Sequence, residues 1–102
     1  MISGIKILSG FSVIMNKPNI IITQQPTGAS ISVNSNYKIN IKSNITSGVE
    51  YQWYKNFIKI DGATASTYQI SNASSTDSGS YYCILSKATT YVKSNTVSIV
   101  VT

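Results

Sequence analysis

The sequence of 102 residues contains no histidine, no arginine, one cysteine and three acidic residues, Glu50, Asp61 and Asp77. Without histidine it lacks the usual imidazole base and the commonest nitrogen ligand of zinc. Three acids are too few for a catalytic carboxylate pair or a calcium site, and the serines have no histidine to activate them. The sequence also has no glycine-rich phosphate loop and no CxxC pair, so we expect no enzymatic activity, no metal and no cofactor.

Basic residues outnumber acidic ones, giving a net charge of +5, but every basic residue is a lysine and the lysines are scattered. A nucleic-acid surface normally clusters its cations and uses the arginine fork to read guanine or phosphate. No apolar run approaches the roughly 20 residues that a membrane helix needs. We therefore expect neither nucleic acid nor a membrane as a partner.

The single cysteine, Cys83, excludes a disulfide within the chain. This fits folding in a reducing compartment without requiring it. The apolar residues near the start, in MISGIKILSGFSVIMNKP, are interrupted by Ser9, Gly10 and Ser12. No small-x-small cleavage site follows them, so we do not interpret this segment as a secretion signal.

Alternating apolar and polar residues replace helical periodicity throughout residues 19–102, which is typical of an all-β protein. In NYKINIKS, for example, Tyr37, Ile39 and Ile41 share one face of a strand and lysine and asparagine share the other. A strand with one buried face needs a second sheet to cover it, so the pattern favours a sandwich or barrel. Seven strands are expected, at 19–26, 29–33, 36–43, 49–56, 66–72, 80–86 and 94–102.

A resemblance to a known family rests on three segments of the sequence: YQWYKN, STYQISNASSTDSGSYYC and SNTVSIVVT. Over residues 19–102 the chain resembles an immunoglobulin-like domain of the intermediate or variable set. The resemblance implies an immunoglobulin-like β-sandwich of two antiparallel sheets with about seven strands, in which Trp53 and Tyr81 are core aromatics. It also makes Tyr81 a tyrosine corner whose hydroxyl bonds to the chain upstream. Gly79 and Asp77 suit the turn beside it.

The resemblance places the family's second cysteine at position 41, where this chain has isoleucine. A disulfide across that separation would contribute roughly 4 kcal/mol, whereas a buried isoleucine contributes about 1.5–3 kcal/mol. We therefore expect an Ile41–Cys83 contact packed on Trp53, with Cys83 a buried structural thiol. The expected structural core consists of Ile39, Ile41, Trp53, Ile70, Asp77, Gly79, Tyr81, Cys83 and Leu85.

If Trp53, Tyr81 and Cys83 face inward, then Tyr54, Tyr82 and Ile84 face outward. With Val100 they would form an exposed aromatic and aliphatic patch, the kind of surface enriched at interfaces. The ordinary alternative is that single exposed apolar residues are common on any protein. The segment 86–94, expected to be a loop, offers Tyr91 as a second candidate contact.

Residues 1–18 lie outside the immunoglobulin resemblance and are predicted to form a separate arm. They are expected to form a β-hairpin around Ser9 and Gly10, with apolar side chains on both faces. One interpretation is that this arm folds back on its own sandwich; the other is that it anchors the chain in a partner by strand addition. The candidate contact residues are Ile5, Ile7, Leu8, Phe11, Val13 and Ile14.

A single immunoglobulin-like domain that needs no disulfide and carries an apolar arm resembles the small accessory proteins of tailed-phage particles. The resemblance is one of architecture. It implies a decoration protein on the virion surface, assembled in the bacterial cytoplasm, bound through its arm to a capsid or other virion subunit and in weak contact with glycans. The alternatives are an adhesion module of a bacterial cell-surface protein, and a secreted eukaryotic receptor fragment carrying glycans at Asn44 or Asn72.

Overall fold

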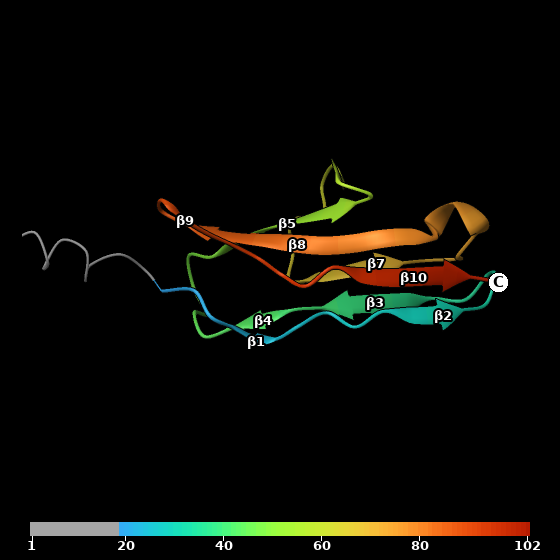
Figure 1. Cartoon of the computed structure of the whole chain (residues 1–102), viewed down its shortest axis with the longest axis horizontal. Helices are drawn as coiled ribbons and strands as arrows, with labels where there is room; N and C mark the ends of the chain where they lie inside the picture. The colour runs from blue at the N-terminus through green and yellow to red at the C-terminus, as the bar shows by residue number, and fades with distance from the viewer. Residues whose placement is uncertain (1–18) are drawn as a thin grey trace, which may run out of the picture.

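The computed structural model describes residues 19–102. Within them the chain forms short strands and one 3-10 turn (Figure 1). In chain order these are β1 (Ile22–Gln24), β2 (Ala29–Ile31), β3 (Tyr37–Asn40), β4 (Lys42–Ser43), β5 (Glu50–Lys55), β6 (Ile58–Lys59), β7 (Thr67–Ile70), η1 (Ser75–Asp77), β8 (Gly79–Lys87), β9 (Thr90–Lys93) and β10 (Val97–Val101).

The strands form two layers. One layer has the strand order β2-β10-β8-β5-β6, with β9 also paired to β8, and the other consists of the pairs β1–β4 and β3–β7. Figure 1 shows β5 and β8 lying above β3 and β4 along the length of the domain. The predicted all-β sandwich is confirmed.

The strand pairs are antiparallel as expected, with one exception: β2 runs parallel to β10. The parallel pairing arises because the chain changes layers near its start. The strand predicted at 19–26 ends at Gln24, and the chain then crosses around Pro26 from the layer of β1 to the layer of β10. Proline has no N–H to continue the pairing. Gly28 then permits a close approach, since a Cβ atom there would lie 2.4 Å from the backbone oxygen of Ser98.

The core lies between the layers and surrounds Trp53, which is fully buried and pairs across β5 and β8 with Cys83. The indole N–H donates to the carbonyl oxygen of Ala65 at 2.8 Å, so the one polar atom of this side chain is satisfied. Of the residues expected in the core, the structure buries Ile39, Ile41, Trp53, Ile70, Tyr81, Cys83 and Leu85.

Asp77 and Gly79 are only half-buried; Asp77 ends η1 and Gly79 begins β8, so their role there is local. The Oδ2 atom of Asp77 accepts a hydrogen bond from the Ser74 N–H at 2.9 Å. The backbone carbonyl of Asp77 accepts one from the Tyr81 hydroxyl at 2.6 Å. This second bond is the tyrosine corner that the sequence predicts. It ties the turn to the core because the Tyr81 ring is fully buried.

Two predicted segments differ from the structure. The strand expected at 36–43 divides into β3 and β4, because the N–H of Ile41 donates to Ser66 rather than to a ladder partner. The segment 86–94 is not a loop: β8 continues to Lys87 and pairs with β9 from Thr90. The connection is only two residues long, and Ala88 adopts a φ of 54° in it.

Candidate functional site

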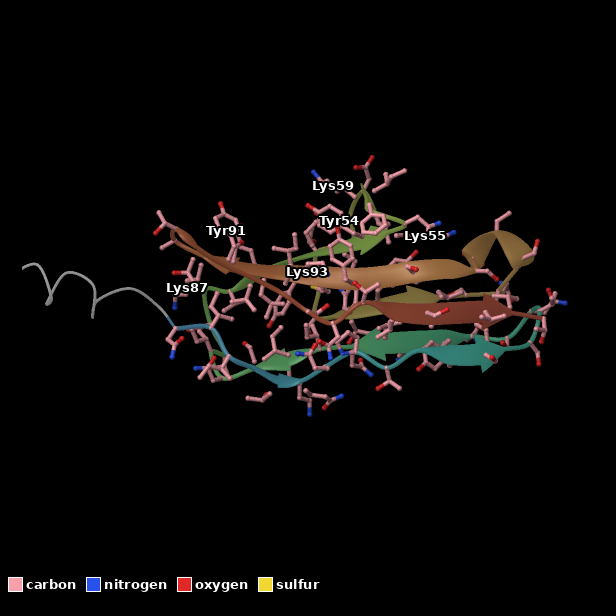
Figure 2. The ribbon with its side chains drawn as sticks, in the orientation of Figure 1. Tyr54, Lys55, Lys59, Lys87, Tyr91 and Lys93 are labelled. Carbon is pink, nitrogen blue, oxygen red and sulfur yellow. The ribbon has the colours of Figure 1, made fainter. Side chains whose placement is uncertain are left out.

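The outward face of β5, β8 and β9 is the candidate site (Figure 2). Because Trp53 and Cys83 point into the core, their neighbours along each strand point to solvent. Cross-strand pairing arranges these neighbours in three rows: Lys59–Tyr54–Tyr82, Gln52–Ile84–Lys93 and Glu50–Ser86–Tyr91.

The prediction that Tyr82 is exposed is wrong, because only 8% of its surface is accessible. Tyr54 lies directly opposite and stacks on its ring with centroids 5.0 Å apart and planes 9° apart. The Lys93 ammonium lies 4.4 Å from the centroid of the same ring, within the range of a cation–π interaction. Phe57 also contacts it, with ring centroids 6.2 Å apart. Tyr82 therefore supports the face and does not offer a free surface.

Three other predicted contact residues, Tyr54, Ile84 and Tyr91, line a groove of ≈ 500 Å³. Tyr54 and Ile84 line it and are half-buried, and Tyr91, which is 70% exposed, completes its rim. Val100 is 43% exposed but lies on β10 and does not line this groove. The structure thus brings Tyr91 together with Tyr54 and Ile84, whereas the sequence treats them as separate candidates.

Glu50 adds a negative charge to the groove. Among residues 19–102, no side-chain hydrogen bond or ion pair engages its carboxylate. The amide of Gln52 is committed, since Nε2 donates to the carbonyl oxygens of Trp53 at 3.1 Å and Ile60 at 2.7 Å. The groove therefore offers one unpaired anion between apolar and aromatic walls.

A second feature of this face is the tip of the β5–β6 hairpin, which sequence reasoning did not single out. Phe57 and Ile58 are 76% and 71% exposed. Asn56 and Phe57 adopt φ values of 50° and 69°, a conformation that a two-residue hairpin turn requires and that Asn-Gly adopts most readily. The sequence does carry a sign of this exposed tip: an apolar pair, Phe-Ile, stands between two lysines where a turn is expected.

Residues 19–102 contain no group of three metal-ligating side chains and no helix of the length and hydropathy that crossing a bilayer requires. Burial raises the pKa of the Cys83 thiol to about 11, so this sulfur is a poor nucleophile at neutral pH. The Asn44 side chain bonds the backbone of Ile21 and Asn19 at 2.8 and 3.0 Å and so has a structural role.

Neither a protein-family model nor a curated protein matches the sequence. Solved structures do match. Tandem Ig repeats of Dlar superpose with a TM-score of 0.73 and 24% identity, covering 81% of this chain and 48% of that one. The fold is that of an immunoglobulin-like domain.

The N-terminal Ig1-2 module of the Drosophila receptor protein tyrosine phosphatase DLAR gives a TM-score of 0.74 at 23% identity, covering 85% of this chain and 48% of that one. Titin M4 gives 0.66 at 18% identity, covering 81% and 95%. This chain spans about half the length of the two Dlar structures. Identities this low establish the fold only, because one fold carries many functions.

The predicted arm, with Ile5, Ile7, Leu8, Phe11, Val13 and Ile14, lies outside the described residues. Its boundary at residue 18 and its role as an anchor therefore stay predictions, as does the location on a phage particle.

Proposed function

We propose that the chain is a non-enzymatic binding module that contacts a protein partner through the outward face of β5, β8 and β9. The observation that carries the proposal is the groove between Tyr54 and Tyr91. It combines exposed tyrosine, an aliphatic floor at Ile84 and an unpaired carboxylate at Glu50. Tyrosine beside apolar groups is characteristic of protein interfaces.

The experiment places a photo-crosslinking amino acid at position 91, on the rim of the groove, in cells that produce the chain. The matched control carries the same group at Val33, which is 49% exposed and lies beyond the end of β2, bonded through its N–H to Thr102. We expect a cross-linked protein at position 91 that is missing at position 33. Equal cross-linking at both positions would show that the groove is not selective.

The finer form of the proposal is a decoration protein of a tailed phage, attached through residues 1–18 to a capsid or other virion subunit. The domain needs no oxidation to fold, because Cys83 is its only cysteine and lies buried in the core. Deleting residues 1–18 should leave a folded monomer that no longer joins the particle. Normal incorporation of the shortened chain would refute the anchor.

The alternative is an adhesion module of a bacterial cell-surface protein. The similarity to the Ig1-2 module of a receptor favours it, because this chain spans about half of that structure. This alternative predicts neighbouring domains of the same fold encoded in the same gene, and display on cells in the absence of any particle. Electron microscopy of purified particles with an antibody to the domain separates the two.

A further inference from the structure

We propose that a second copy of this chain is the partner of the face, with the β5–β6 tip of each copy (residues 56–59) in the groove of the other. The inference deepens the proposed function and relies on it for the choice of face. It rests on a complementarity in shape and charge between two surfaces of the same molecule.

The tip is a fixed apolar projection. Phe57 and Ile58 expose about three-quarters of their surfaces. The turn that carries them is bonded to β8, since the Asn56 N–H donates to the Ser80 carbonyl at 2.8 Å and Asn56 Oδ1 accepts from the Ser80 N–H at 2.9 Å. A turn whose backbone is already held in its binding conformation loses little conformational freedom on association.

The groove has the properties needed to receive that tip. Its ≈ 500 Å³ lies within the range of about 300–1,000 Å³ typical of binding pockets. Ile84 gives it an apolar floor, and the rings of Tyr54 and Tyr91 stand at its sides. An exposed aromatic anchor in such a pocket is the usual centre of a protein interface.

The charges match as well. Lys55 and Lys59 flank the apolar pair in the sequence, and Glu50 lies in the groove without a partner among residues 19–102. Lys55 already donates to the carbonyl oxygen of Thr76, which leaves Lys59 as the available cation. Placing Phe57 of one copy in the groove of another brings Lys59 toward Glu50. An anionic lipid surface would use the tip alone and would leave the carboxylate unpaired.

The arrangement of the two features favours reciprocal exchange. Tip and groove lie on one face toward opposite ends of β5, because the tip follows Lys55 and Glu50 lines the groove. Figure 2 shows Lys59 and Tyr91 well apart on the side of the molecule where Tyr54 lies. A two-fold axis parallel to this face and across the strands sets the tip of each copy over the groove of the other. The resulting contact is isologous and closed, so it produces a dimer and not a filament.

Sedimentation velocity of the full chain over a range of concentrations tests the proposal. We expect the wild type to associate reversibly to a dimer, and Phe57→Ser to weaken association at least tenfold. Val33→Ser, at another exposed apolar position outside the face, should leave it unchanged. Urea unfolding of each variant separates lost association from lost folding.

Charge reversal supplies the decisive measurement. Glu50→Lys and Lys59→Glu should each weaken self-association at least tenfold, and an equimolar mixture of the two variants should restore the dimer, because both contacts of the mixed pair are again opposite in charge. Association through residues 1–18 would not respond to either substitution, and unchanged dimers would overturn the proposal. Two other results would also overturn the proposal. In the first, the wild type is monomeric and position 91 still cross-links to a different protein, which leaves the proposed function intact. In the second, the wild type is monomeric and binds phosphatidylserine vesicles through Phe57.

Discussion

Replacing Ile41 with cysteine tests the arrangement of the core most directly. Ile41 and Cys83 are 2% and 0% exposed and belong to the cluster around Trp53. A disulfide across the 42-residue separation of positions 41 and 83 would stabilise the folded state by about 4 kcal/mol through loop entropy. Exchanging the isoleucine side chain for the smaller cysteine side chain removes about 1–2 kcal/mol, between the costs of Ile→Val and Ile→Ala. The oxidised Ile41→Cys variant should therefore be about 2–3 kcal/mol more stable than the wild type.

Urea unfolding with and without reductant measures this difference, and titration of free thiols in the unfolded chain reports the bridge. In a domain of this size each kcal/mol raises Tm by about 4–8 °C. The reduced variant should be less stable than the wild type, because it has lost the packing of Ile41 and has no disulfide to offset that loss. Ile39→Cys, equally buried two residues away, is the control and should form no bridge. Two free thiols in the oxidised Ile41→Cys variant would show that positions 41 and 83 do not face each other.

Three further outcomes follow from the same contacts. Tyr81→Phe removes the hydrogen bond to the Asp77 carbonyl and should lower the free energy of unfolding by about 1–2 kcal/mol in urea melts, whereas an unchanged midpoint would show that the corner is dispensable. Burial raises the pKa of Cys83 from 9.0 to about 11. The unfolded chain therefore loses this proton first, and stability should fall by about 2 kcal/mol between pH 9 and 11, with a flatter profile in Cys83→Ala. Gly28→Ala would place a Cβ 2.4 Å from the Ser98 backbone oxygen and should cost more than about 2 kcal/mol. A melt like that of the wild type would show that β2 and β10 can separate there without loss.

The sequence was sufficient to predict the interior because burial imposes a period of two on every strand that faces the core. Ile39 follows from that alternation, the resemblance to immunoglobulin-like domains implied Trp53 and Tyr81, and alternation from Tyr81 then turned Cys83 inward; the structure buries all four. Alternation also assigned Tyr82 to the outward face. It could not show that Tyr54 and Lys93 cover the ring, since those contacts depend on strand register and on side-chain length.

The β8–β9 hairpin was not predictable from turn chemistry. Two-residue hairpin turns favour Asn-Gly or Asp-Gly, whereas this one contains Ala88 and Thr89, with Ala88 at positive φ. No residue in 86–94 favours a tight reversal, so the sequence predicts a loop there and does not place Tyr91 beside Tyr54. Tertiary pairing with β8 outweighs the local preference and completes the groove.

The parallel pairing of β2 with β10 has a mechanical consequence. The described chain starts and finishes at opposite ends of the long axis (Figure 1), and Ala29, Ser30 and Ile31 pair with Ile99, Val100 and Val101. Tension applied between Asn19 and Thr102 would slide these two strands past each other, so that all of their hydrogen bonds bear load together instead of opening one at a time. A domain joined in this way should resist stretching well beyond what its equilibrium stability alone suggests.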